Sequence, residues 1–320
     1  MNDFNFNISA PLHVELALTS SCQLSCTYCS AMPFNGKFAP KESTIKLLND
    51  LCDYRVFSLL LSGGEPTLHP FFLDFLKCVS GKISEITVNT NGIKLSHMAY
   101  AKEFHQVSPN TNVAVSLDSA DITINDIRRG TGGKQAIRAI ENLCALDHPV
   151  CISTVLTADN LECAEELIDR FFPKVKIFRF FPMVPRNNSE LEDNDKAYQK
   201  SVEHFFEKIN ERTIAFPELK AILPYKSSSI NEQGSLFKEL EYCCCAFTKL
   251  FIDSELNAYP CYYSANVDTT VGNFNVDSFK DVWQSSKAIE LRELSKTQSL
   301  CNLSWSDQRL PHKYVHTHNE

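Results

Sequence analysis

Short apolar, β-rich runs alternate with helical patterns up to residue 181, and this alternation constrains the fold more than any other feature. The runs are HVELALT (13–19), VFSLLL (56–61), EITVNT (85–90), NVAVSL (112–117), VCISTVL (150–156) and VKIFRFF (175–181). The helical patterns between them lie near 41–54, 70–79, 96–105, 133–146 and 160–171. Such alternation predicts right-handed βαβ units and an α/β fold with a parallel sheet, either open or curled into a partial barrel.

Polar or glycine-rich segments follow the first four of these runs. They are TSSCQLSCTYCS (19–30), SGGEPT (62–67), NTNG (89–92) and SLDSAD (116–121). In parallel α/β sheets, function gathers on the loops that leave the carboxyl ends of the strands. The sequence therefore predicts one functional site at that edge of the sheet.

The first of these loops carries three closely spaced cysteines, Cys22, Cys26 and Cys29. Thiolates are soft ligands that suit iron–sulfur clusters and zinc. A structural zinc site normally has four ligands, whereas three cysteines can hold three corners of a cubane [4Fe–4S] cluster and leave one iron for another ligand. Tyr28 would then present an aromatic face beside the cluster. A zinc site or packing thiols are the alternatives.

The spacing of Cys22, Cys26, Tyr28 and Cys29 resembles the C-x3-C-x-aromatic-C signature of the radical S-adenosylmethionine (SAM) superfamily, and GGEP at 63–66 resembles its second motif. The resemblance implies a partial (β/α)6 barrel and a [4Fe–4S] cluster whose open iron binds the amino and carboxylate groups of SAM. One electron then cleaves SAM to methionine and a 5′-deoxyadenosyl radical, which abstracts a hydrogen atom from a substrate.

The same resemblance implies SAM contacts on the GGEP loop. Gly63 and Gly64 would let the backbone approach the ligand without an intervening Cβ. Glu65, followed by Pro66, would accept hydrogen bonds from the SAM ammonium group. A plain tight turn is the alternative for this segment.

The later loops supply further candidates by resemblance. Asn91 and Ser116 resemble the ribose and methionine contacts of the family, although Asn-Gly is also a common turn pair. Asp118 is either a contact or polar support, and Arg128 would pair with the SAM carboxylate. The adenine would lie near two residues of the last strands, Val155 and Phe181.

A compact C-terminal segment begins at Cys243. The run KLFIDSELNAYP (249–260) predicts a hairpin with its turn near 254–257, and a helix follows at roughly 277–295. That helix is expected to bury four apolar residues, Phe279, Val282, Trp283 and Ile289.

The cysteines of this segment resemble the ligands of C-terminal auxiliary-cluster domains in the same superfamily. Cys243, Cys261 and Cys301 would bind a second iron–sulfur cluster. A full SPASM domain would supply more cysteines, so the shortened twitch form fits better. Cys244 or Cys245 would complete the cluster, or one iron would stay open to substrate or another ligand. Alternatively, Cys244 or Cys245 would donate a hydrogen atom, as in epimerases of the superfamily. A structural or zinc-binding role is the alternative.

These features predict four parts of the chain. They are a partial barrel over 1–186, a helical linker over 187–240, a small hairpin-plus-helix cluster domain over 241–305 and a tail over 306–320.

Composition limits the partners and the compartment. The formal net charge of −8 argues against a broad nucleic-acid footprint. No apolar run is long enough to span a membrane, and the N-terminus does not read as a signal peptide. A cytoplasmic, reducing location follows, in which thirteen cysteines favour metal binding or catalysis over a disulfide framework.

The preferred function is that of an oxidoreductase or epimerase-type radical SAM enzyme. It would oxidise, epimerise or catalyse an elimination on a small polar metabolite such as a sugar, aminocyclitol or nucleoside. Its electron donor would be a flavodoxin or ferredoxin. The alternative is a maturase that crosslinks or epimerises a ribosomally made precursor peptide. About a dozen residues precede the first strand, too few for the leader-binding domain that many peptide maturases carry, and this weighs slightly against the maturase alternative because some maturases do without it. A different class altogether is a non-catalytic iron–sulfur electron carrier or sensor.

Overall fold

The computed structural model describes residues 8–29, 35–183, 195–223, 247–265 and 267–295. Within these ranges the strands form one sheet with the order β10-β9-β8-β1-β2-β3-β4-β5-β6-β7. From the N-terminus the strands are β1 (His13–Ala17), β2 (Ser58–Ser62), β3 (Glu85–Thr90), β4 (Asn112–Ser116), β5 (Val150–Leu156), β6 (Ile177–Pro182), β7 (Lys220–Ile222), β8 (Lys249–Ile252), β9 (Asn257–Tyr259) and β10 (Gly272–Asn273).

Strands β1 to β7 pair in parallel with their neighbours, so the α/β prediction and all six predicted strands are confirmed. Strand β7 was not among the predicted strands. It lies in the segment 187–240, which the sequence predicts as a linker, and it pairs with β6. Three residues are too few for an alternating pattern to stand out.

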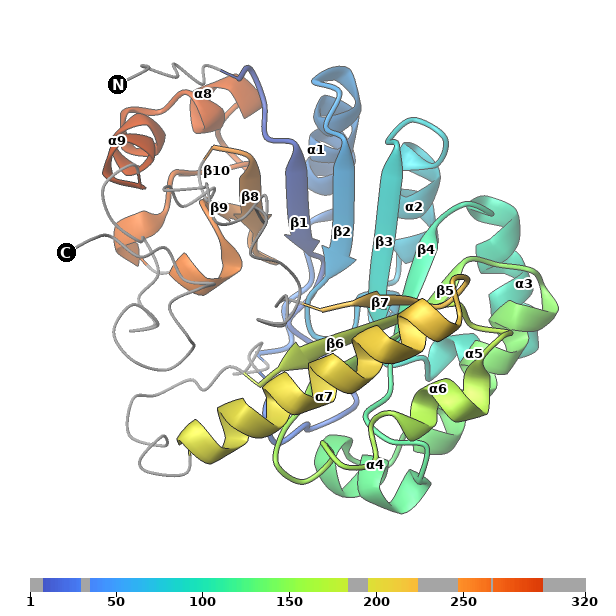
Figure 1. Ribbon diagram of the computed structural model, residues 1–320. Coiled ribbons are helices and arrows are strands. Elements are labelled where there is room, and N and C mark those ends of the chain that lie inside the picture. Colours follow the sequence, from blue (N-terminus) through green and yellow to red (C-terminus); the bar gives the residue numbers. More distant parts are fainter. Residues whose placement is uncertain (1–7, 30–34, 184–194, 224–246, 266, 296–320) are drawn as a thin grey trace.

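Helices fill the connections between these strands and cover one face of the sheet (Figure 1). They are α1 (Lys41–Asp53), α2 (Phe72–Val79), α3 (Met98–Val107), α4 (Ile122–Arg129), α5 (Gly133–Ala145), α6 (Glu166–Phe171) and α7 (Asp195–Ala215). Short 3-10 turns occur at η1 (Pro66–Leu68), η2 (Lys94–Ser96), η4 (Tyr262–Ser264) and η5 (Val267–Thr269).

Helix α4 follows directly on the polar segment SLDSAD and has no counterpart among the predicted helices. Its N-cap is Asp121, whose carboxylate accepts a hydrogen bond from the backbone N–H of Thr123 at 2.7 Å. An aspartate at this position satisfies one of the unpaired N–H groups of the first turn. The helix therefore begins with a recognisable cap within the polar segment SLDSAD.

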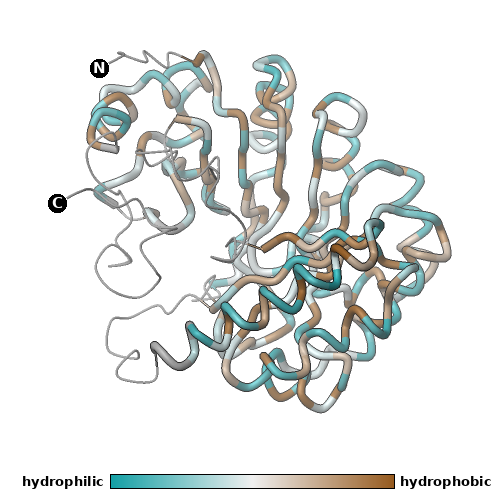
Figure 2. The backbone as a smooth tube through the Cα atoms, viewed as in Figure 1, coloured by the Kyte–Doolittle hydropathy of each residue, from teal (hydrophilic) through white to brown (hydrophobic). Residues whose placement is uncertain are grey.

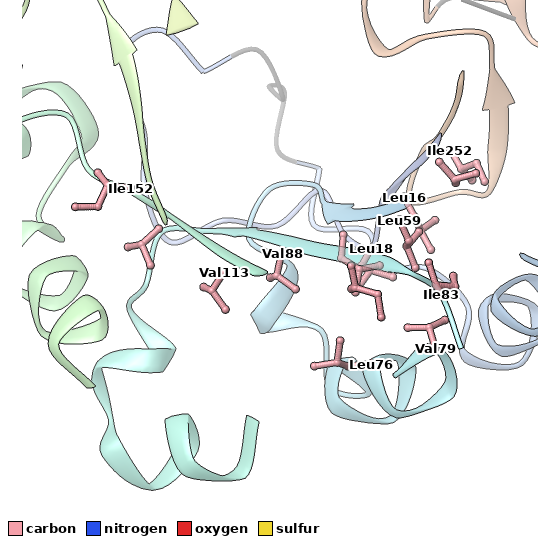
Figure 3. Packing of buried hydrophobic residues seen from close by; sticks show 14 of the residues in the cluster. Leu16, Leu18, Leu59, Leu76, Val79, Ile83, Val88, Val113, Ile152 and Ile252 are labelled. Atoms are coloured by element: carbon pink, nitrogen blue, oxygen red, sulfur yellow. The ribbon is translucent and has the colours of Figure 1, made fainter. Parts of the chain in front are cut away.

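The core lies between the sheet and these helices. In β1, Val14 and Leu16 are buried on the helix-covered face, whereas Glu15 points to the other face and is only partly buried. Strands β2 and β3 show a similar alternation, and Figure 3 shows Leu16, Leu59 and Val88 on the side of the sheet where Leu76 and Val79 of α2 lie. Hydrophobic and hydrophilic bands also alternate along α7 (Figure 2), which packs its apolar side against β6.

The predicted C-terminal hairpin is confirmed, because β8 and β9 pair antiparallel. The Asp253 carboxylate stabilises the turn by accepting hydrogen bonds from the N–H groups of Glu255 and Asn257, each at 2.9 Å. The hairpin extends the barrel sheet, because β8 also pairs in parallel with β1 (Figure 1). Residues far apart in the sequence are thereby neighbours in one sheet.

The predicted helix over 277–295 is two helices, α8 (Phe279–Trp283) and α9 (Ser286–Ser295). Phe279, Val282 and Trp283 are buried as expected, but Ile289 is 50% exposed, so its predicted inward position is wrong. The physical reason is the break at Ser285. Its hydroxyl accepts a hydrogen bond from the N–H of Ala288 and caps a new helix, which changes the face that α9 presents to the core.

Among the described residues, no helix combines the length and the apolar character needed to cross a membrane.

His148 predicts a specific acid sensitivity. It is 3% exposed, its Nδ1 lies 2.9 Å from Nδ1 of His105, and burial together with that neighbour lowers its pKa from 6.5 to about 4. The unfolded chain binds the extra proton at higher pH, so stability is lost as pH falls from 6.5 to about 4. We expect this group to contribute a loss of about 3 kcal/mol.

The measurement is the free energy of unfolding in urea at several pH values across this window. His148→Gln should flatten the decline seen in the wild-type protein. The exposed His97→Gln variant should leave it unchanged, and an equal decline in all three proteins would contradict the prediction.

Candidate functional site

The three cysteines of the first motif lie on the loop after β1. Cys22, Cys26 and Cys29 are partly buried, and none forms a disulfide. The loop is folded on itself, because the N–H of Cys29 donates to the carbonyl of Cys26 at 3.1 Å. Burial raises the pKa of the Cys22 and Cys26 thiols. Three unpaired thiols on one loop are a donor set that suits an iron–sulfur cluster.

In the part of the chain that the structure describes, no three His, Cys, Asp or Glu side chains converge as a site for a single metal ion.

The glycines of the GGEP loop pack directly against the backbone of the cysteine loop. A Cβ added to Gly63 would lie 2.2 Å from the carbonyl oxygen of Thr19, and one added to Gly64 would lie 2.2 Å from that of Ser21. The N–H of Gly64 donates to the Thr19 carbonyl at 2.7 Å. Glycine is therefore required at both positions because the GGEP loop packs closely against the cysteine loop.

Glu65 is buried and joins three parts of the site. Its Oε1 accepts hydrogen bonds from the hydroxyls of Thr67 at 2.6 Å and Thr90 at 2.8 Å, and its Oε2 accepts one from the N–H of Asn91 at 2.7 Å. Burial raises the pKa of the carboxyl group. Pro66 follows as the first residue of η1. The predicted contact of Glu65 with the SAM ammonium stays a prediction.

Asn91 links the third loop to the cysteine loop. Its Nδ2 donates to Oε1 of Gln23 at 3.0 Å and lies 3.8 Å from Sγ of Cys22. Ser116 ends β4, pairs with Ser153 of β5 and is partly buried. Both candidates thus lie at the carboxyl edge of the sheet, as predicted.

Asp118 is fully buried and collects three side-chain partners around its carboxylate. The Tyr28 hydroxyl donates to Oδ2, and guanidinium nitrogens of Arg128 and Arg129 lie 3.6 and 3.5 Å from the same oxygen. The N–H of Val155 donates to Oδ1 at 3.1 Å. Burial also raises the pKa of the Tyr28 hydroxyl. Asp118 was predicted either to contact SAM or to support the loop, and its hydrogen bonds and ion pairs are those of a residue that supports the loop.

Arg128 is engaged inside the protein. Besides Asp118, its guanidinium donates to the Thr157 hydroxyl and to the Val155 carbonyl at 3.0 Å. Its own carbonyl accepts the N–H of Thr27 at 3.0 Å, which fixes the cysteine loop to the end of α4. The predicted pairing of Arg128 with the SAM carboxylate stays untested.

Sequence reasoning missed Arg129. Its Nη1 donates to the Tyr28 hydroxyl at 2.5 Å, and its carbonyl lies 3.7 Å from Sγ of Cys26. Burial alone would lower the pKa of its guanidinium, but Asp118 and Tyr28 raise it overall. The sequence signal that could have identified it is the adjacent pair Arg128 and Arg129. Two neighbouring cations in a polar segment indicate a buried acid as their counter-charge.

Of the candidate cysteines for the second cluster, Cys261 alone lies within the described residues. Cys261 is partly buried and precedes η4, and its carbonyl accepts a hydrogen bond from the Ser264 hydroxyl at 3.0 Å. The remaining candidates, Cys243, Cys244, Cys245 and Cys301, lie outside the described residues.

Two family models match this chain. The radical SAM superfamily model matches residues 16–171, and the SPASM model, described as an iron–sulfur cluster-binding domain, matches residues 243–303. Together they cover the cysteine loop, the GGEP loop, the Asp118 network and the second set of cysteines. A [4Fe–4S] cluster with SAM and auxiliary iron–sulfur binding are the cofactors that these matches imply.

Among curated proteins, the chain is 26% identical to the mycofactocin maturase MftC of Mycobacterium tuberculosis, over 93% of this chain and 76% of that protein. It is 22% identical to the sporulation killing factor maturation protein SkfB of Bacillus subtilis, over 94% of this chain and 72% of that protein. The solved structure of SuiB from Streptococcus suis with bound S-adenosylmethionine shares the fold, with a TM-score of 0.74, 20% identity, and coverage of 92% of this chain and 71% of SuiB.

The Asp118 network predicts an asymmetry between two acids that contact the same arginine. Asp118→Asn should reduce the free energy of unfolding by about 3–5 kcal/mol, because it leaves two buried guanidinium groups without their counter-charge. Asp159 lies 3.7 Å from Arg128 but its side chain is 82% exposed, so Asp159→Asn should change stability by less than about 1 kcal/mol. Urea unfolding of both variants tests this, and equal losses would contradict it.

Proposed function

Because the chain belongs to the radical SAM superfamily and carries a SPASM-type segment, we propose that it is a maturase that modifies a ribosomally synthesised precursor peptide. The observation that carries this proposal is the match of two named maturases, MftC and SkfB, to more than nine tenths of the chain. The TM-score of SuiB supports the shared fold only.

The preferred prediction of a small polar metabolite as substrate is not supported by these relatives, which favour the peptide alternative. The short segment before β1 is a weaker argument against a maturase than the relatives are in favour of one. That segment bears only on one way of binding a peptide leader, whereas the matches to MftC and SkfB extend over both the barrel and the C-terminal segment.

In this proposal, Cys22, Cys26 and Cys29 would hold the [4Fe–4S] cluster. Together with bound SAM, that cluster supplies the 5′-deoxyadenosyl radical by which this family removes a hydrogen atom from a carbon. The thiols fit this role because they are partly buried, close in sequence and free of disulfides.

The surrounding residues would fix the cysteine loop and the SAM position. The Asp118 network ties the loop to the end of α4, and Gly63 and Gly64 let the second loop pack against it. Asn91 and Ser116 would contact SAM from the edge of the sheet. Glu65 would contact the SAM ammonium as well as holding Thr90 and Asn91.

The C-terminal segment would bind an auxiliary cluster through Cys243, Cys261 and Cys301. Only three candidate thiolates with this spacing favour the shortened twitch form. Cys244 or Cys245 would supply a further ligand or donate a hydrogen atom. A flavodoxin or ferredoxin would supply the electron. In the same proposal the chain divides into four parts, with boundaries after residues 186, 240 and 305.

The test is a peptide assay with the anaerobically reconstituted protein, SAM and a strong reductant. Short peptides encoded next to the gene are added and analysed by mass spectrometry. We expect loss of two hydrogen atoms from one peptide if it is crosslinked, or deuterium uptake from heavy water if it is epimerised. The Cys26→Ala variant, which lacks one cluster ligand, should do neither.

Two results would contradict the proposal. Formation of 5′-deoxyadenosine coupled to a sugar or nucleoside, without any change in a peptide, would support the metabolite alternative. Failure to cleave SAM under strong reductant would instead favour the non-catalytic electron carrier or sensor.

The auxiliary cluster predicts a defined iron content. Reconstituted protein should contain about eight irons per chain, and Cys261→Ala should lower this to about four, because each cubane holds four irons. Cys144, a partly buried cysteine of α5, offers a matched control whose alanine variant should keep the full content. An unchanged iron count in Cys261→Ala would overturn the auxiliary-cluster assignment.

A further inference from the structure

Arg179 lies on β6 and faces the interior of the partial barrel. Its neighbours Phe178 and Phe180 point the other way and are fully buried, and Phe180 packs against Phe205 of α7. Arg179 is only partly buried and pairs in register with Ser153 of β5. It is therefore a charged side chain on the side of the sheet that the helices do not cover.

The guanidinium reaches across the sheet interior instead of toward solvent. Its Nη1 donates to Oδ1 of Asn89 on β3 at 3.4 Å, although β4 and β5 lie between β3 and β6. The interior residues of those two strands near this path, Ala114, Cys151 and Ser153, are small. Their size leaves room for the long side chain to span the interior.

Arg179 forms no ion pair with any described residue, although its guanidinium contacts the Cys151 thiol and its Cζ lies 5.2 Å from the centroid of the Phe181 ring. The charges of Arg128 and Arg129, by contrast, are both paired with Asp118. The acid that faces Arg179 from β1 is Glu15, which accepts a hydrogen bond from Ser62 at 2.8 Å and does not pair with the guanidinium. A guanidinium in the sheet interior without a counter-charge costs stability, so its retention points to an anionic group supplied by a ligand.

The depth of this group separates it from the cysteine loop. Asn91 contacts Cys22, and Asn89 lies two residues earlier on β3. Two residues of strand span roughly 7 Å. The guanidinium thus reaches β3 one step deeper than Asn91, whereas Arg179 itself lies in register with Ser153 and Ser116, at the level of one predicted SAM contact.

Resting on the proposed function, we propose that Arg179 recognises a carboxylate of the peptide substrate, either an Asp or Glu side chain or the C-terminal carboxylate. A guanidinium matches a carboxylate in two parallel hydrogen bonds, and such charge-assisted pairs fix orientation as well as adding affinity. This contact would hold the peptide at the level of Ser116, beside the predicted SAM contacts.

The test measures retention of defined peptides by the anaerobically reconstituted full-length protein with SAM. Four pools of N-acetylated heptapeptides carry Glu or Gln at the centre and a C-terminal acid or amide, with no other charged residue. Retained peptides are separated by gel filtration and quantified by mass spectrometry. SAM affinity and iron content are measured on the same samples, because neither should depend on Arg179.

We expect the wild-type protein to retain at least one acidic pool about tenfold more than the pool with Gln and amide. Arg179→Gln should abolish this preference, and Arg179→Lys should keep part of it through its point charge. Arg138→Gln removes an exposed arginine of α5 and should behave as wild type. If peptides with a C-terminal amide are no longer preferentially retained, the group that Arg179 recognises is the C-terminal carboxylate. If peptides with a central Gln are no longer preferentially retained, the recognised group is the acidic side chain.

Three outcomes overturn the assignment. They are an acid preference that survives Arg179→Gln, a wild-type protein without any preference or retention, and a loss of SAM affinity in Arg179→Gln that parallels the loss of peptide. The last would place Arg179 in the SAM site. A protein that modifies its peptide but shows no acid preference overturns this assignment alone, whereas failure to modify any peptide overturns the proposed function.

Discussion

The buried carboxylate of Asp118 is the interaction on which the arrangement of the site depends. Two of its partners, Arg128 and Arg129, come from the last turn of α4, and the third, Tyr28, lies between two of the cysteines. Each charge would be costly to bury alone, so the three groups are stable in this position only together. Because Tyr28 is part of the cysteine loop, the ion pair also determines where the thiols lie.

The other loops reinforce that constraint through the backbone. Gly63 and Gly64 bring the second loop within hydrogen-bond distance of the first, and Glu65 connects the second loop to the third through Thr90 and Asn91. Three successive βα loops therefore interlock around the cysteines. The rigidity that a cluster site needs comes from polar contacts between loops, which the apolar core on the other face of the sheet cannot supply.

The sequence predicted the six barrel strands well, because apolar alternation and the βα spacing are local signals. The cysteine and GGEP motifs were also visible, since their chemistry lies in a few consecutive residues. Arg129 and β7 were missed because each depends on a partner outside its own segment, namely Asp118 and β6. The break at Ser285 has a local signal, a serine that can cap the helix that follows it, which the single predicted helix did not use. The orientation of Arg179 toward Asn89 likewise appears only when β3 and β6 are curled toward each other.

The parallel pairing of β1 with β8 also has a consequence for how the chain acquires its fold. Residues 13–16 meet residues 249–252, so one edge of the first strand stays unpaired until most of the polypeptide has left the ribosome. The Trp283 indole, which donates to the Ile8 carbonyl at 2.9 Å, adds a second contact between the two ends of the chain. Contacts of such long sequence separation form slowly, and an open strand edge invites wrong pairing in the meantime. The C-terminal segment that carries the second set of cysteines is thus also the segment that covers the open edge of β1.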